Sequence, residues 1–343
     1  MPAAKNYRLL LLLLVFIMIF MAFLNVSLGS VSIPFKDIVS ILFQQEVTNE
    51  SWSYIILEYR LPKVFTAILT GSGLAVSGLL MQTLFRNPLA GPYVLGLSSG
   101  ASLGVALVIM GATLFGGTAA VLLVSKWSLV IASSLGSLLV LLAVLMASAR
   151  LRDTMAILII GLMFASLTAA VVSVLAYFSP VAQLQQYIFW SFGSLGDLSW
   201  QEVAILSSFW FFGILIAIAC IKNLNTLLLG EQYARSLGVK ISRNRFLIII
   251  ATSLLAGSIT AFAGPIAFVG LAVPHLIRQV IPANDHRTLL PAVILGGAIL
   301  MLACDIAAQV PGSEYTLPIN AITSLIGAPV VIWLLIRKRK FIF

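Results

Sequence analysis

Residues 82–102 read QTLFRNPLAGPYVLGLSSGAS and interrupt a chain that is otherwise dominated by Leu, Val, Ile and Ala. Within this stretch, Arg86-Asn87-Pro88 is soon followed by Gly91-Pro92. Pro88 and Pro92 have no backbone N–H, and a proline disfavours helical geometry in the residue before it. The stretch therefore predicts an irregular break between two apolar helices.

The composition identifies the class of protein. Of the 343 residues, 61% are hydrophobic and only 9% are charged, and the mean hydropathy is +1.10. Soluble globular domains carry roughly 25% charged residues, so this chain is expected to be a polytopic membrane protein. Cys220 and Cys304 lie far apart in apolar runs, and their spacing predicts neither a disulfide nor a metal site.

Charged residues mark the borders of the spanning segments, because a helix needs ~20 mostly apolar residues to cross a bilayer. For example, 22 uncharged residues separate Lys63 from Arg86, and 23 separate Lys126 from Arg150. The eighth expected segment is too short to cross comfortably and is a candidate for one half of a broken pair with the seventh. The chain is expected to be all-α, with a single transmembrane domain over 1–343 and ten helices at 9–28, 61–84, 93–110, 118–148, 154–178, 201–221, 246–263, 266–281, 289–308 and 318–336.

The basic residues predict the orientation in the membrane. With Lys5 and Arg8 placed inside, 16 of the 20 basic residues fall on inner segments, as the positive-inside rule requires. An even number of crossings then places both basic termini in the cytoplasm. The pI of about 9.8 therefore reports topology rather than nucleic-acid binding. The first helix is expected to be retained, because its uncharged run extends to Phe35 without an evident signal-peptide cleavage site.

The residues that could carry chemistry argue against an enzyme. His275 and His286 carry no metalloprotease motif, and a structural role is favoured for His275. Asp305 is the carboxylate that the expected helices place within the membrane, and pairing fits it at least as well as ion coupling. No Gly is followed by Lys, so the chain lacks a P-loop and any ATP must be bound by another subunit. An ATP-independent secondary carrier or channel is the alternative.

The longest inner loop, residues 222–245, contains the segment LLLGEQYARSLGVKISRNR, which has the signals of a short helix. Glu231 suits the positively polarised first turn, Gly238 can supply a left-handed stop, and Ser242 can cap the next helix. Such a helix either packs on its own neighbouring helix ends or docks another subunit, and the pattern leaves both open. The apolar residues that can share one side are Leu228, Leu229, Tyr233, Ala234 and Leu237.

Five segments in this order resemble the transmembrane subunits of ATP-binding-cassette importers for iron–siderophore complexes, haem and cobalamin. They are RLPKVFTAILTGSGLAVSGLLMQTLFRNPLAGPYVLGLSSGA, GEQYARSLGV, AGPIAFVGLAVPHLIR, DHRTLLP and LIGAPVVIWLL, and the similarity covers nearly the whole chain. The resemblance implies the type II importer fold in the bacterial inner membrane. It also implies a homodimer around a central path, with two cytoplasmic ATPases below it and a solute-binding protein above it. ATP and Mg would bind to the ATPases and no cofactor to this chain. On family frequency, a ferric siderophore is the first substrate expected, with haem and cobalamin as alternatives.

The resemblance also implies roles for residues on the inner side. A cytoplasmic gate corresponds to Asn87 and Leu89, with Thr154 as a third position, although the first two could instead serve a plain hairpin turn. The element that couples the chain to the ATPase corresponds to Glu231, Tyr233, Ala234, Arg235, Leu237 and Gly238.

On the outer side, Arg60 and Lys63 match a basic pair that meets acidic residues of the binding protein. Anchoring to lipid headgroups is the alternative for this pair. The chain departs from the family pattern nearby, because Gln309, Thr316 and Asn320 stand where Arg, Glu and Gly are frequent. Contacts with the binding protein are therefore expected to differ at this end.

Two Gly-Pro breaks suggest an internal repeat. The segments GPYVLGL at 91–97 and GPIAFVGL at 264–271 are expected at helix junctions on opposite membrane faces. An inverted repeat of residues 61–178 against 246–336 would produce this arrangement. Helix breaks are expected at Pro88, Pro92, Gly264 and Pro265.

Overall fold

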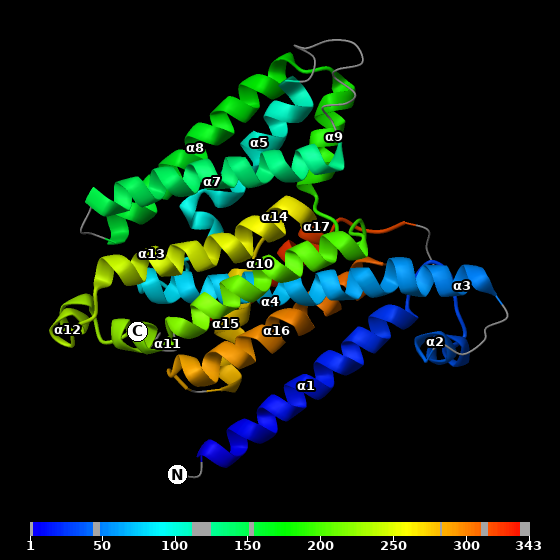
Figure 1. Ribbon diagram of the computed structural model, residues 1–343, viewed down its shortest axis with the longest axis horizontal. Helices are drawn as coiled ribbons and strands as arrows, with labels where there is room; N and C mark the ends of the chain where they lie inside the picture. The colour runs from blue at the N-terminus through cyan, green and yellow to red at the C-terminus, as the bar shows by residue number, and fades with distance from the viewer. Residues whose placement is uncertain are drawn as a thin grey trace.

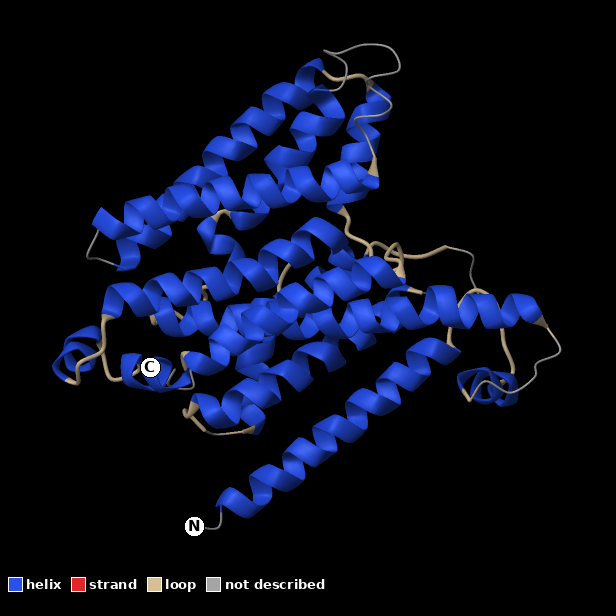
Figure 2. Ribbon diagram, in the orientation of Figure 1, coloured by secondary structure: helices blue, strands red, loops and turns tan. Residues whose placement is uncertain are grey.

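A computed structural model of the chain describes residues 3–43, 49–111, 125–150, 154–281, 283–309 and 315–336 (Figure 1). Within these ranges the chain forms helices joined by short connections, and no strand is present (Figure 2). The prediction of an all-α protein is therefore confirmed for the part of the chain that the structure describes.

One helix runs through the centre of the molecule. Helix α4 (Leu61–Phe85) continues the π-helix η1 (Ile55–Arg60) and the short helix α3 (Glu50–Tyr54), so that one span extends from Glu50 to Phe85. Almost every side chain of α4 is buried, because other helices surround it on all sides. Its neighbours are α1 (Ala3–Ser27), α10 (Trp200–Ala219), α13 (Ile241–Thr252), α15 (Val269–Val280) and α16 (His286–Ala308).

Glycines let the backbones of these helices approach closely. A Cβ added at Gly78 would lie 1.7 Å from the carbonyl oxygen of Gly270 on α15, and one added at Gly71 would lie 2.2 Å from that of Gly297 on α16. Close helix contacts through small residues are typical of membrane proteins, where dispersion rather than the hydrophobic effect holds helices together. The many small residues of α4 thus fix its distance from α15 and α16.

A second group of helices packs beside the central one. Figure 1 shows it above α13 and α14 (Ser258–Ala263), which follow each other through the π-helix η4 (Ser253–Gly257). Its core is again a glycine contact, since a Cβ at Gly136 would lie 2.0 Å from the carbonyl oxygen of Gly100. The members of this group are α5 (Leu97–Gly111), α7 (Lys126–Arg150), α8 (Thr154–Phe178) and α9 (Val181–Ser191).

The spans agree with most of the expected segments, although the count of ten stays a prediction. Seven described helices are long and apolar enough to cross a membrane, and two shorter apolar helices cover Leu97–Gly111 and Ile319–Trp333. The expected segment 154–178 is confirmed as α8, whereas the beginning of the segment 118–148 lies outside the described residues. The eighth segment is the short helix α15, and α17 (Ile319–Ile336) is the last. The helices α2 (Phe35–Leu42), α3 and α9 were not expected.

The segments that follow the two Gly-Pro breaks contact each other inside the bundle. Residue Pro92 lies against Gly270, and the Tyr93 hydroxyl accepts a hydrogen bond from the N–H of Ile266 at 3.4 Å. The physical reason is that both connections fold back into the bundle. The helices that follow them, α5 and α15, are short and begin inside it. The placement of the two breaks on opposite membrane faces and the inverted repeat both stay predictions.

Candidate functional site

The expected coupling segment forms a separate helix at one end of the bundle (Figure 1). Helix α11 (Ile221–Leu227) leads through Gly230 into α12 (Glu231–Ser236). Ala234 is fully buried, whereas Tyr233 and Leu237 are 53% and 58% exposed. The apolar residues thus do not share one covered side, because only Ala234 turns towards the neighbouring helix ends. Three large apolar side chains, Leu229, Tyr233 and Leu237, are left at the surface.

An ion pair holds helix α12 to the bundle, and a left-handed glycine ends the helix. The Glu231 carboxylate lies 3.4 Å from the guanidinium of Arg245, which is buried on α13, and 4.0 Å from that of Arg235. Gly238 follows the helix with φ +83°, so the expected left-handed stop is confirmed. The expected cap by Ser242 is wrong, because α13 begins at Ile241 and Ser242 lies inside its first turn.

The expected gate segment is a tight irregular connection after α4. Arg86 adopts a left-handed conformation with φ 46°, which ends the helix. The side-chain oxygen of Asn87 accepts the N–H of Leu89 at 2.9 Å, so the amide supports the turn, as the hairpin alternative requires. Leu89 is 43% exposed, and Pro92 opens the 3₁₀-helix η2 (Pro92–Leu95).

The breaks at Pro88, Gly264 and Pro265 are confirmed as non-helical, and Pro92 interrupts the α-helices as the first residue of the 3₁₀-helix η2. Thr154 is the first residue of α8, as expected. Its place in a gate stays a prediction.

The gate segment and the coupling segment lie next to each other. A Cβ at Gly230 would lie 3.6 Å from the guanidinium of Arg86. On the other side, the ring of His275 on α15 contacts the carbonyl oxygen of Pro88 at 2.7 Å, which confirms a structural role for this histidine. Arg278, also on α15, donates to the side chain of Gln82 at 3.2 Å. The turn after α4 is therefore fixed by α15 and borders the approach to α12.

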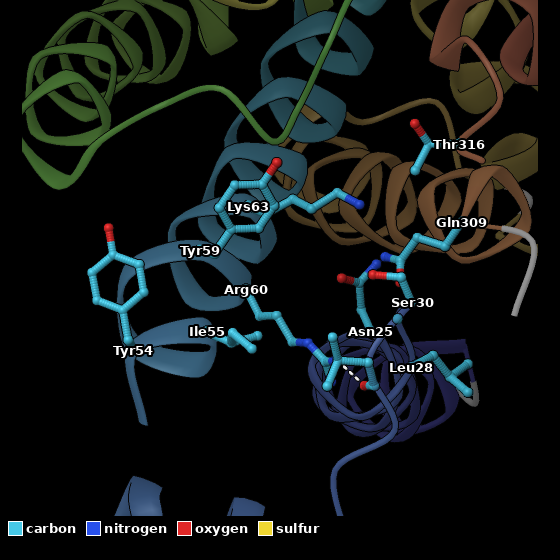
Figure 3. A pocket seen from close by; sticks show the side chains of 12 residues that line it. Asn25, Leu28, Ser30, Tyr54, Ile55, Tyr59, Arg60, Lys63, Gln309 and Thr316 are labelled. Atoms are coloured by element: carbon cyan, nitrogen blue, oxygen red, sulfur yellow. Dashed lines mark hydrogen bonds between the residues drawn. The ribbon is translucent and has the colours of Figure 1, made fainter. Parts of the chain in front are cut away.

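At the opposite end, the predicted docking residue Arg60 is buried beside a cavity of about 220 Å³ (Figure 3). Its guanidinium donates to the carbonyl oxygens of Val26 at 2.8 Å and Ser27 at 3.2 Å, and it also reaches that of Val31. These carbonyls lie at and just beyond the C-terminal end of α1, where a helix leaves acceptors without intrahelical donors. In this structure Arg60 thus holds the end of α1.

Lys63 is also engaged within the chain. Its ammonium group lies 3.0 Å from the Asp305 carboxylate, which is almost fully buried on α16. The amides of Asn25 and Gln309 donate to the same carboxylate at 2.8 and 2.9 Å. Structural pairing of Asp305 is thereby confirmed, and Gln309, which stands where the family often has Arg, belongs to this cluster. Figure 3 shows Gln309, Asn25 and Lys63, which surround this carboxylate. Docking by Arg60 and Lys63 stays a prediction.

The two other departures from the family pattern have different surroundings. Thr316 lines the same cavity as Arg60 and Lys63. Asn320 lies at the start of α17, and its side-chain oxygen accepts the N–H of Ala267 at 3.0 Å. Asn320 therefore supports the second Gly-Pro break. Among the residues that the structure describes, no three His, Cys, Asp or Glu side chains gather as a metal site would require.

Comparisons with known proteins agree with this architecture. Residues 15–337 match the FecCD transport family. The hemin transport system permease protein HmuU of Yersinia pestis is 36% identical over 334 residues, which cover 97% of both chains. The vitamin B12 import system permease protein BtuC of Klebsiella pneumoniae subsp. pneumoniae is 37% identical over 290 residues, or 83% of each chain.

A solved structure supports the same conclusion. It is described as an inward-facing metal-chelate type ABC transporter, and it superposes with a TM-score of 0.84 at 30% identity over 96% of this chain and 99% of its own. The chain therefore belongs to the FecCD transport family and is an integral-membrane permease subunit of the ABC importer type.

Proposed function

We propose that the chain moves a bulky metal chelate across the bacterial inner membrane as one half of a homodimer, with both termini in the cytoplasm. ATP and Mg are bound and used by two partner ATPases, and a solute-binding protein delivers the substrate from outside. A ferric siderophore is the first substrate to test. Haem and cobalamin stand beside it, because HmuU and BtuC are named for hemin and vitamin B12.

The observation that carries this proposal is the exposed pair formed by Tyr233 on α12 and Leu237 directly after it. Two large apolar side chains on a short helix that is anchored by Glu231 form a rigid contact for a partner subunit. Aromatic side chains of this kind are typical anchors of protein interfaces. Because α12 borders the turn at Arg86, closure of the ATPases would move the coupling segment and the gate together.

The experiment compares two double variants of the chain reconstituted in proteoliposomes with its cognate ATPase and binding protein. Tyr233→Ala/Leu237→Ala removes the exposed pair at α12, and Tyr177→Ala/Phe178→Ala removes an even more exposed pair at the end of α8. ATP-dependent uptake is measured with radiolabelled ferrichrome, haemin and cyanocobalamin. The first variant is expected to lose about tenfold or more of its uptake and of its affinity for the ATPase, because interface anchors contribute ~2 kcal/mol or more each. Equal uptake by both variants and the wild type would refute the assignment.

The rival function is an ATP-independent carrier or channel. The chain reconstituted alone, with an ion gradient imposed, distinguishes the two. Flux of any of the three substrates without an ATPase would favour the rival.

A further inference from the structure

The buried His286 links α11, the helix before the coupling segment, to α4, the helix before the gate segment. His286 is the first residue of α16 and is 1% exposed. Its Nδ1 lies 2.7 Å from the side-chain oxygen of Asn225 on α11, and its Nε2 lies 2.9 Å from the hydroxyl of Thr83 on α4. One imidazole ring therefore connects three helices that are far apart in the sequence.

Each end of this chain of contacts is close to a functional segment. Asn225 lies on α11, and only Leu228–Gly230 separate the end of α11 from the start of α12. On the other side, the carbonyl oxygen of Thr83 accepts the N–H of Arg86 at 3.3 Å, which closes the last turn of α4. A shift of α11 would thus be passed to Thr83 through two side-chain hydrogen bonds, and from the Thr83 carbonyl to Arg86, where the gate segment begins.

The contact between His286 and Thr83 has two possible arrangements. The Asn225 oxygen is an acceptor, so the Nδ1–H of a neutral His286 donates to it and Nε2 becomes an acceptor. The single hydroxyl proton of Thr83 then has two acceptors at 2.9 Å, the Nε2 atom and the carbonyl oxygen of Leu79. Thr83 is fully buried, so either choice leaves one acceptor without this donor. An element with two discrete arrangements is what energetic coupling between sites requires.

We propose that His286 is a positioning residue that transmits the displacement of α11 and α12 to the gate segment through Thr83. This role rests on the proposed function, since it presupposes that a partner ATPase moves α12. The competing explanation is purely local. Asn225 also accepts the backbone N–H of His286 at 2.9 Å, so the cluster could serve only to stabilise the first turn of α16.

A mutant cycle between the two ends separates these explanations, because Asn225 and Thr83 both contact His286 from opposite sides. The variants Thr83→Val and Asn225→Ala are made singly and together in the full complex with ATPase and binding protein. Thr83→Ser, which keeps the hydroxyl, is the rescue variant, and Thr83→Ala replaces Thr83→Val if the latter does not accumulate. The matched control is Thr226→Val, since the Thr226 hydroxyl on α11 donates to the Lys222 carbonyl of its own helix at 2.8 Å.

The readout is substrate transported per ATP hydrolysed, with whichever of radiolabelled ferrichrome, haemin or cyanocobalamin the wild type takes up. Each single variant is expected to lower this ratio about threefold or more, while Thr83→Ser and Thr226→Val keep it. The double variant is expected to lower it no further than the stronger single variant, because both changes interrupt one connection.

Two results would overturn the proposal: an unchanged ratio in Thr83→Val, or effects that multiply in the double variant. A purely local role would lower thermal stability without changing the ratio. A wild-type complex without ATP-driven uptake would instead refute the proposed function itself.

Discussion

Replacing Lys63 by Met is expected to destabilise the isolated chain, because the change leaves the buried Asp305 carboxylate without its counter-charge. The two groups are 3.0 Å apart, and their side chains are only 15% and 4% exposed. If Lys63 were instead a free docking residue, the substitution would affect only the binding protein and not the folding of the chain by itself.

The size of the effect follows from what remains around the carboxylate. Removing one partner of a buried ion pair costs ~3–5 kcal/mol. Asp305 keeps the amides of Asn25 and Gln309 at 2.8 and 2.9 Å, so Lys63→Met is expected at the lower end, about 3 kcal/mol. The double variant Lys63→Met/Asp305→Leu leaves no uncompensated charge and is expected to cost less than the sum of the single variants.

The assay is equilibrium unfolding in mixed detergent micelles, without ATPase or binding protein present. Reaction of the buried thiols Cys220 and Cys304 with a fluorescent maleimide reports the unfolded fraction. A Lys63→Met chain that unfolds at the same denaturant concentration as the wild type would refute the reasoning. So would a double variant whose cost equals the sum of the two single variants.

Three further changes test other parts of the structure. Gly78→Ala should destabilise the chain by ~1–3 kcal/mol or more, because the new Cβ would lie 1.7 Å from the Gly270 carbonyl oxygen and must move to about 3.4 Å. Gly91→Ala should leave the stability unchanged, because the space around Gly91 is open. Equal melting temperatures for these two variants would contradict the close packing. Arg60→Met should speed amide hydrogen exchange around residues 28–31, because carbonyl oxygens near the end of α1 lose a buried donor; unchanged exchange would argue for a docking role only. At Asp285, partial burial favours a higher pKa, but hydrogen bonds and nearby positive charge outweigh it and lower the pKa below 3.8. This stabilisation is present above pH 3.8 and is lost as the pH falls through the lower folded-state pKa, so Asp285→Asn should flatten the acid limb of a pH–stability curve.

The sequence was most informative where local chemistry decides the structure. Hydropathy and charge located the spans, and Pro88, Pro92 and Gly264 marked junctions because proline and glycine restrict or release the backbone itself. Gly238 as the end of α12 was readable for the same reason. By contrast, the short helices α2 and α9 lack the long apolar run on which the assignment of spans depended.

The environment of each charged residue was not readable, because the partners lie far away in the chain. Nothing local to Arg60 shows that carbonyl oxygens about 30 residues earlier surround its guanidinium. Asp305 and Lys63 are separated by most of the protein, so a basic residue at a helix end could only be interpreted as exposed. The role of His286 could not be predicted from the sequence for the same reason. Its contacts to Asn225 and Thr83 depend on how three helices pack.

The burial of α4 has a consequence for biogenesis. Among the seven long spans, the segment Glu50–Phe85 has the lowest hydropathy, 1.8, and the highest buried share, 89%. The part of the chain that is least suited to lipid is therefore the part that the finished protein hides most completely. During synthesis, however, α4 leaves the ribosome long before α15 and α16 exist to cover it, because the N-terminal part emerges first. Its hydroxyl-rich surface must then be sheltered by the insertion machinery or by α1 until the later helices arrive, so chains truncated before α15 should be retained by that machinery or degraded.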